Sequence, residues 1–190
     1  MDDAPHADDA ILARRAAEGC VESFATLARR YQVPVVHYVR RLAGRVGGEQ
    51  ADDVAQDTFL RAWRRIDQYD CRWAFSTWLF TIARRTWLNH ARGSRRRRVR
   101  ETAAAVAGVC IVEPAVGLLE EERAARLWDV AAAELSEREF TAVWMRYVEE
   151  KSLAEVAEVL GRPVATTKVI LFRARRRLAP LVRDLTGWSD

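Results

Sequence analysis

The hydrophobic positions of this chain recur at intervals of three and four residues, a spacing that predicts α-helices. In the first half of the chain, four stretches show it: residues 9–30 with a break near Gly19, 33–43, 52–66 and 76–91. Residues 67–73 carry no periodicity and are expected to form a loop, and Ser76 or Thr77 offers an N-cap for the helix that follows. No strand-like alternation of useful length and no internal repeat is present, so we predict an all-α fold.

Composition changes sharply after residue 94. Residues 95–118 open with a run of arginines, continue through small residues and contain Pro114 and Gly117, a composition that buries little surface. A second helical stretch follows. We therefore predict two small helical domains, residues 9–94 and 119–185, joined by a flexible basic linker over 95–118.

The sharpest local pattern lies between residues 152 and 178. Ser152 and Glu155 have the spacing of a capping box, in which each side chain bonds the other residue's backbone N–H. An apolar stripe follows and stops at Gly161, and proline at 163 then favours a turn. The next helix has five positions spaced for burial: Val164, Thr167, Leu171, Ala174 and Leu178. Two short helices around a Gly/Pro turn predict a helix-turn-helix, whose second helix enters the major groove of DNA.

The outward face of this second helix allows two interpretations. Its basic residues favour DNA: Lys168, Arg173, Arg175, Arg176 and Arg177. Val169, Ile170 and Phe172, however, are apolar where a groove-reading helix usually carries polar side chains. An apolar side chain contacts a thymine methyl group but does not read a guanine edge. An ordinary helical hairpin with a solvated basic face gives the same pattern.

A second candidate surface lies on the predicted helix 52–66. One face of this helix is acidic with an apolar centre, and its members are spaced three and four residues apart: Asp53, Gln56, Asp57 and Leu60. The functional interpretation is a docking surface for a basic helical partner. Acidic residues at a helix start also complement the helix dipole, which is the alternative for Asp52 and Asp53.

Aromatic residues and arginines alternate between residues 73 and 92. Such a segment suits single-stranded nucleic acid, because rings stack on unpaired bases while guanidinium groups hold phosphates. Tryptophans at helical spacing are more often core, and we expect this of Trp78. The nucleic-acid role therefore falls on the preceding loop, 68–73, and on the arginines after Trp78.

Charge supports two contacts with a polyanion. The 190 residues carry 31 basic side chains against 27 acidic ones, and all but Lys151 and Lys168 of the basic residues are arginines. Residues 84–100 hold eight arginines and no acid, residues 162–183 hold seven basic residues and no acid, and the stretch between these blocks is acidic. Separated basic blocks of this kind are the electrostatic footprint of nucleic-acid binding.

Several classes of protein are disfavoured. A hydrophobic fraction of 49% argues against disorder, and no apolar run is long enough for a membrane span. The acidic start does not resemble a secretory signal, and three scattered cysteines fit a reducing compartment, so a cytoplasmic location is expected. His6, His37 and His90 are scattered and no glycine-rich phosphate loop is present. We expect no catalytic residues, no metal and no cofactor.

Three blocks together resemble the bacterial sigma factors of the extracytoplasmic-function type, within the sigma-70 family. Residues 52–63 (DDVAQDTFLRAW) look like the core-polymerase-binding helix, and residues 75–84 (FSTWLFTIAR) look like the promoter-melting and −10-reading segment. Residues 146–178 look like the −35-reading helix-turn-helix. The resemblance covers roughly residues 9–183.

The resemblance implies a promoter-specificity subunit of RNA polymerase and assigns roles by position. Polymerase binding, to the β′ clamp helices, falls on Asp53, Gln56, Asp57 and Leu60; contact with the polymerase β flap is also implied. Recognition of the −10 element and of the melted non-template strand falls on Arg72, Trp73, Arg84, Arg85, Asn89 and Arg92. Recognition of the duplex −35 element falls on Thr166, Lys168, Val169, Phe172, Arg173 and Arg176. An anti-sigma factor or similar regulator is a further implied partner.

One departure from the family pattern affects the −35 face. The turn commonly reads Val-Gly-Thr-Val-Lys-Ser-Arg, whereas here residues 164–170 read VATTKVI, so that Val169 and Ile170 replace a small polar residue and an arginine. The departure implies altered or weakened −35 recognition, or an apolar patch that meets a protein partner. The alternatives to a sigma factor are a helix-turn-helix regulator acting without polymerase and a protein-interaction module.

Overall fold

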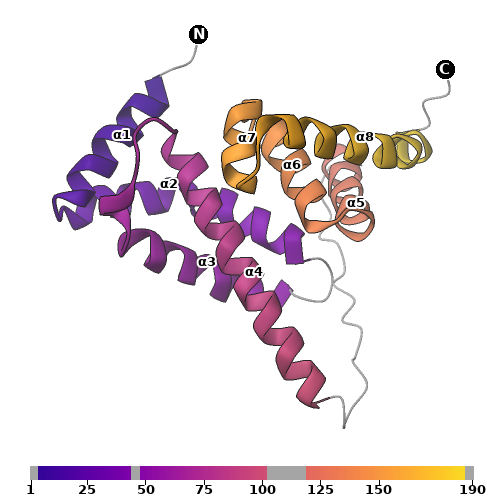
Figure 1. Ribbon diagram of the computed structural model, residues 1–190, viewed down its shortest axis with the longest axis horizontal. Helices are drawn as coiled ribbons and strands as arrows, with labels where there is room; N and C mark the ends of the chain where they lie inside the picture. The colour runs from indigo at the N-terminus through magenta and orange to yellow at the C-terminus, as the bar shows by residue number, and fades with distance from the viewer. Residues whose placement is uncertain (1–3, 44–47, 102–118, 187–190) are drawn as a thin grey trace. The chain divides into compact units, whose positions relative to one another are not determined.

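The computed structural model describes residues 4–43, 48–101 and 119–186 (Figure 1). All regular structure among these residues is helical, which confirms the all-α fold. The chain divides into two compact units, residues 1–39 with 49–102 and residues 40–48 with 103–190. Each unit is described by itself.

The first unit is built from four α-helices and one short 3₁₀ helix: α1 (Ala4–Ala17), α2 (Val21–Ala43), α3 (Gly48–Trp63), η2 (Ile66–Gln68) and α4 (Phe75–Glu101). Its largest fully buried side chains include Leu27, Val35 and Tyr38 of α2 and Leu79 and Phe80 of α4. The rings of Tyr38 and Phe80 meet edge-on, with centroids 5.5 Å apart. The core therefore lies mainly between α2 and α4, against the buried face of α3.

Helix α2 is longer than the sequence pattern predicts. It runs without interruption through Pro34, whereas the pattern separates residues 9–30 from 33–43. A proline inside a helix costs about 3 kcal/mol, because it removes one hydrogen bond and crowds the preceding turn. Leu27 before Pro34 and Val35 after it are both fully buried, so packing on both sides of the proline offsets this cost. The real break lies at Gly19, whose φ of +96° suits glycine.

Helix α4 differs from the prediction at both ends. It begins at Phe75, and the Trp78 N–H donates to the Ala74 carbonyl at 3.3 Å, so neither Ser76 nor Thr77 is the N-cap. Both hydroxyl side chains are instead buried inside the first turn. The helix continues to Glu101, so residues 95–101 of the predicted linker are helical, because arginine is a good helix former and no proline interrupts the run. Residues 102–118 of the predicted linker lie outside the described residues.

The second unit contains α5 (Leu119–Glu134), α6 (Glu137–Tyr147), α7 (Leu153–Leu160) and α8 (Val164–Thr186). Its core joins Phe140 and Met145 of α6, Val156 of α7 and Leu171 and Ala174 of α8, all of them buried. Trp128 of α5 adds an aromatic contact, with its ring centroid 4.9 Å from that of Trp144. Helices α7 and α8 form the predicted helix-turn-helix inside this unit.

The local signals of the helix-turn-helix are confirmed. Ser152 and Glu155 form a reciprocal capping box at the start of α7, and Gly161 ends that helix in the left-handed region at φ 61°. Of the five positions predicted to be buried on α8, Val164 is wrong: it is 42% exposed, because it opens the helix beside an exposed turn. The other four, Thr167, Leu171, Ala174 and Leu178, are buried as predicted.

Candidate nucleic-acid and protein interfaces

Helix α3 divides into a buried face and an exposed acidic face. Val54, Ala55 and Ala62 are buried, and the Thr58 hydroxyl, also buried, donates to the Val54 carbonyl at 2.7 Å. The opposite face carries the four residues of the predicted polymerase-binding surface, which the structure brings together: Asp53, Gln56, Asp57 and Leu60. We call these four residues the acidic face.

The acidic face combines charge with an apolar contact point. Leu60 is 50% exposed, although leucine usually lies inside a folded protein. Asp57 accepts a hydrogen bond from the Arg61 guanidinium at 2.9 Å, a pair four residues apart on one helix. The arrangement can receive a basic helix that also presents one apolar side chain.

The loop between η2 and α4 is held by its own polar groups. The Arg72 backbone N–H donates to Asp70 Oδ1 at 3.0 Å, and the Arg72 guanidinium donates to Asp70 Oδ2 at 2.6 Å. These hydrogen bonds to Arg72 hold the pKa of the exposed Asp70 carboxyl below its ordinary value. The Tyr69 hydroxyl also donates to the Trp73 carbonyl at 2.8 Å. The loop thus presents Arg72 outward on an ordered backbone.

Beneath the loop lies an aromatic cluster, consisting of Tyr31, Tyr69, Phe75 and Trp78. Consecutive rings of this cluster lie 5.6–5.7 Å apart between centroids. Phe75 is fully buried, whereas Trp78, expected in the core, is only partly buried. Burial raises the pKa of the Tyr69 hydroxyl to about 12. The cluster joins the loop to α2 and α4.

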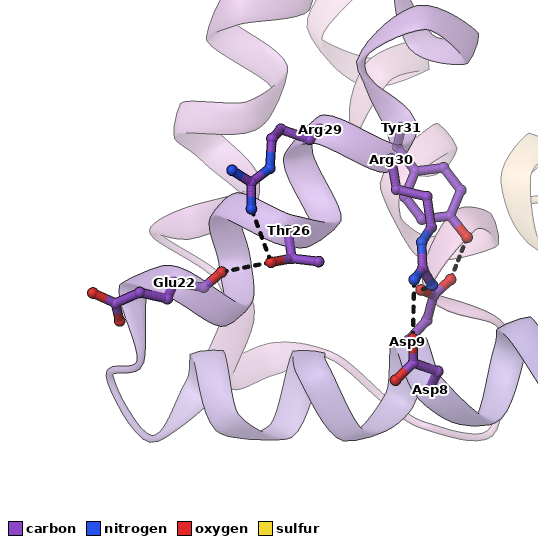
Figure 2. A network of polar contacts seen from close by, with 7 residues as sticks. All are labelled: Asp8, Asp9, Glu22, Thr26, Arg29, Arg30 and Tyr31. Atoms are coloured by element: carbon purple, nitrogen blue, oxygen red, sulfur yellow. Dashed lines mark hydrogen bonds and ion pairs between the residues drawn. The ribbon is translucent and has the colours of Figure 1, made fainter.

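A polar network on α1 and α2 fixes one edge of this cluster (Figure 2). Asp9 is fully buried, and its carboxylate accepts hydrogen bonds from the Arg30 guanidinium and from the Tyr31 hydroxyl. Arg30 also pairs with the exposed Asp8 at 2.9 Å. Burial first, and then the hydrogen bond to Asp9, raises the pKa of Tyr31. We call Asp9, Arg30 and Tyr31 the Asp9 clamp.

The sequence analysis did not find the Asp9 clamp. Its partners stand 21 and 22 residues apart, which is no local spacing. Near the clamp, Thr26 donates to the Glu22 carbonyl at 2.9 Å and accepts from Arg29 at 3.2 Å, as Figure 2 also shows. The sequence contains an acidic pair at 8–9 and the pair Arg30-Tyr31. Many other acidic and basic residues of this chain could be paired in the same way, so these residues alone do not predict the contact.

The predicted −10 residues on α4 fall on two sides of the helix. Arg85, Asn89 and Arg92 stand four and three residues apart and are exposed, so they share one stripe. Arg84 is only 8% exposed and faces the interior, which separates it from that stripe. Trp73 is partly buried and Arg72 is exposed, so the loop supplies one charge and one ring close to the start of the helix.

The predicted −35 residues all lie at the exposed surface of α8: Thr166, Lys168, Val169, Phe172, Arg173 and Arg176. Val169 and Phe172 are 47% and 65% exposed. Two arginines predicted to lie on the same face have partners on α5 and α6. Arg177 donates to Glu139 at 3.0 Å and to the Glu134 carbonyl, and the Arg175 guanidinium lies 6.0 Å from the centroid of the Tyr147 ring.

Comparisons with known proteins show which family the chain is similar to. The family model of Sigma-70 region 2 matches residues 27–97, and that of Sigma-70, region 4 matches residues 126–178. The ECF RNA polymerase sigma factor SigW of Bacillus subtilis (strain 168) is 29% identical over 176 residues, which cover 88% of this chain and 93% of SigW. The RNA polymerase sigma-H factor of Pseudomonas aeruginosa is 32% identical over 189 residues, which cover 93% of this chain and 96% of that protein.

Solved structures are similar as well. CnrH in complex with the cytosolic domain of CnrY matches with a TM-score of 0.68 and 26% identity, covering 93% of this chain and 98% of CnrH. The sigma factor RpoE of Bartonella quintana, solved with the anti-sigma factor NepR, matches with a TM-score of 0.71 and 22% identity, over 90% of this chain and all of RpoE. The second likeness supports the fold alone.

The two family models and the P. aeruginosa relative define the class of protein. Sigma-70 proteins are non-catalytic subunits that give RNA polymerase its promoter specificity, and the two models match two of their regions. The chain belongs to the sigma-70 family and, within it, to the extracytoplasmic-function sigma factors, which direct RNA polymerase to promoters. None of the helices in the described residues is long and apolar enough to span a membrane.

Proposed function

We propose that the acidic face of α3 binds the β′ clamp helices of core RNA polymerase, while the two units engage the promoter at two elements. The first domain, residues 9–94, takes the melted −10 region, and the second, residues 119–185, takes the duplex −35 region near the β flap. The observation that carries the proposal is the acidic face itself: three polar side chains that share one face with the half-exposed Leu60, on the helix that the Sigma-70 region 2 model includes.

The polymerase contact is supported by shape and charge. A helix docks well against a helix when its exposed residues recur at i, i+3, i+4 and i+7, which is the spacing from Asp53 to Leu60. Asp53 and Asp57 favour a basic partner, and Leu60 supplies apolar area at one end of the face. The Asp57–Arg61 ion pair orients the carboxylate on the helix surface.

Binding of core polymerase tests this contact. We expect the full chain to bind tightly and the variant Asp53→Ala/Gln56→Ala/Asp57→Ala to bind at least tenfold more weakly, because charged contacts set both orientation and association rate. The matched control Glu18→Ala/Glu22→Ala/Gln32→Ala also removes two acidic side chains and one glutamine, from exposed positions of the same unit. Equal binding by both variants would overturn the assignment of the acidic face, and no binding by the wild type would overturn the polymerase role.

The −10 contact is supported by the stripe of Arg85, Asn89 and Arg92 and by the loop beside it. Positions 85 and 92 are separated by about 10 Å along the helix axis, at 1.5 Å per residue, so they can follow several phosphates of one strand. Arg72 and the ring of Trp73 lie in the loop at the N-terminal end of α4, where unstacked bases would be captured. Arg84 is left out of the direct contacts because it is buried.

Promoter opening by the assembled holoenzyme tests the −10 contact. We expect Arg85→Ala/Arg92→Ala to reduce binding of the holoenzyme to promoter DNA with a partly single-stranded −10 region by tenfold or more. The same variant should flatten the salt dependence of this binding, since each phosphate contact releases counterions. Arg14→Ala/Arg29→Ala is the matched control, because both arginines are exposed in the same unit. Equal losses in both variants would indicate a general charge effect and would contradict the assignment.

A regulatory partner and a cytoplasmic location complete the proposal. CnrH was solved in complex with the cytosolic domain of CnrY, and we extend regulation by a protein that binds the sigma factor to this chain. Transcription initiation requires the compartment that holds the polymerase and the DNA. Co-purification of the full chain from its host with core polymerase, and with a second protein that competes for it, would test both statements.

A further inference from the structure

The outward face of α8 has a layout that the −35 role alone does not explain. Thr167, Leu171, Ala174 and Leu178 form its buried stripe. At 100° per residue, the positions within about 50° of the opposite direction include Ala165, Val169, Phe172, Arg173 and Arg176. Val169 and Phe172 are the large apolar side chains among them, 47% and 65% exposed, and we call them the apolar pair.

Charged and polar groups lie on both sides of the apolar pair. Lys168 flanks it on one side, and Thr166 and Arg173 flank it on the other, all of them exposed. In the described part of the chain, Lys168, Arg173 and Arg176 form no ion pair, whereas Arg177 turns back to Glu139. Residues 162–183 contain no acid. This surround is complementary to a polyanion.

The apolar area is too small for a separate protein partner. A stable protein interface buries at least about 1,000 Å², and two side chains framed by charges supply only a small part of this. The neighbouring exposed ring of Tyr147 lies under the Arg175 guanidinium, 6.0 Å from its centroid, and so does not extend the patch. Duplex DNA fits better, because flanking cations bind its phosphates while the centre of the helix reaches the groove floor.

We propose that Val169 and Phe172 read thymine methyl groups, so that the upstream element of this factor's promoters carries thymine where these two side chains meet the major groove. The inference rests on the proposed −35 role of the second domain. Guanine, adenine and cytosine present donors and acceptors in the major groove, for which a valine or phenylalanine has no partner. The thymine C5-methyl is the one apolar group on a base edge there.

The spacing of the apolar pair predicts where the thymines lie. Val169 and Phe172 are about 4.5 Å apart along the helix axis, and base pairs rise by about 3.4 Å. The two contacts therefore fall on base pairs one or two steps apart. Lys168, Arg173 and Arg176 hold the flanking phosphates, which fixes the register of the helix.

The experiment starts from full-length chain assembled with core polymerase and a library of duplexes randomised in the upstream element. We expect selection to enrich thymine at two neighbouring positions. In the enriched duplex, deoxyuridine in place of either thymine removes only the methyl group, and we expect about a fourfold loss of affinity per methyl. Replacing thymine elsewhere in the duplex is the control and should change nothing.

Variants then assign the effect to the two side chains. We expect Val169→Ala and Phe172→Ala each to abolish the difference between thymine and deoxyuridine at one position. Val148→Ala should preserve it, because Val148 is exposed in the same unit but lies outside α8. Val169→Arg should shift selection at its position towards guanine, which arginine reads with two hydrogen bonds. Circular dichroism verifies that each variant is folded.

The outcomes separate the inference from the function on which it rests. Failure to bind core polymerase, or selection of no upstream sequence, would overturn the proposed function and the inference with it. Selective binding with equal affinity for thymine and deoxyuridine would overturn the inference alone. Loss of discrimination in Val148→Ala as well would also overturn it, because the effect would then not belong to the apolar pair.

Discussion

The two units of this sigma factor hold their recognition surfaces in different ways. In the second unit, each short helix is fixed largely by residues close to it in sequence: capping boxes at Ser136–Glu139 and Ser152–Glu155 and the left-handed Gly161. In the first unit, the loop before α4 rests on an aromatic cluster that Asp9, far away in sequence, locks through Tyr31. The loop of the first unit therefore depends on a contact distant in sequence, whereas the ends of α6 and α7 in the second unit are fixed by local ones.

This difference suits what each surface is proposed to bind. Duplex DNA has a regular groove, and a preformed helix face such as that of α8 matches it without rearrangement. Unstacked bases are irregular, and a loop anchored by side chains can admit them while its frame stays fixed. A change at Asp9, far from the loop in sequence, should therefore alter the proposed −10 capture, whereas a change outside the second unit should leave the proposed −35 reading largely intact.

Removal of the Asp9 carboxylate should have the largest effect on the first unit, whose loop it helps to hold. We expect Asp9→Ala to lower the free energy of unfolding of the first unit by about 1–3 kcal/mol, because the Arg30 guanidinium and the partly buried Tyr31 hydroxyl both lose their buried acceptor. Native-state hydrogen exchange resolves the loss by unit. Asp8→Ala, on the 55% exposed neighbour, should cost less than about 1 kcal/mol. Equal costs for both would contradict a central role of Asp9.

Titration of the clamp tyrosine should also distinguish the units. The pKa of Tyr31 is raised in the folded chain, so its contribution to stability is complete below the ordinary tyrosine value of 10.0 and is lost as the pH rises above it. We expect the first unit to lose protection from hydrogen exchange above about pH 10 before the second does. Tyr31→Phe should reduce this pH dependence, and an unchanged slope would contradict it.

Removing one cap should have a smaller and confined effect. We expect Ser152→Ala to cost about 1 kcal/mol, because it leaves the backbone N–H of Glu155 without the serine oxygen. The loss should appear in the second unit only, measured by thermal unfolding and by hydrogen exchange of α7. Thr166→Ala, at an exposed site of α8, serves as the control and should change stability by less than about 0.5 kcal/mol.

The smallest expected effect concerns a partly buried carboxyl in the turn after α6. Burial raises the pKa of Glu149, although the Trp144 indole N–H donates to its carboxylate at 3.2 Å. Its stabilising contribution is therefore present at acid pH and lost as the pH rises through the raised value. We expect Glu149→Gln to stabilise the second unit by less than about 1 kcal/mol at pH 7 and not at pH 4. A gain at both values would contradict this cause.

Sequence reasoning succeeded where the signals are local. The periodicity predicted helices throughout, Ser152, Glu155 and Gly161 predicted the helix-turn-helix boundaries, and the spacing from Asp53 to Leu60 predicted one exposed face. Each of these features depends on residues within one or two turns of each other. Their geometry follows from the helix itself.

Sequence patterns did not predict the features that depend on packing between helices. Pro34 lies inside a continuous helix, and Arg84 is buried although it stands next to the exposed Arg85. The Asp9 clamp needs two helices to meet, which no spacing within either helix records. Assignment of individual base and polymerase contacts stays a prediction, because it depends on a surface that the partner supplies.

The carboxylate of Glu139 joins two helices of the second unit. One oxygen, Oε2, accepts from the Ser136 backbone, from the Ser136 hydroxyl and from Arg177, so the start of α6 and the middle of α8 meet at this carboxylate. Val169 and Phe172 lie about 7–12 Å from Arg177 along the same continuous helix. A residue outside the proposed DNA-binding face therefore helps to hold that face in place, because the Glu139–Arg177 contact fixes α8 to α6.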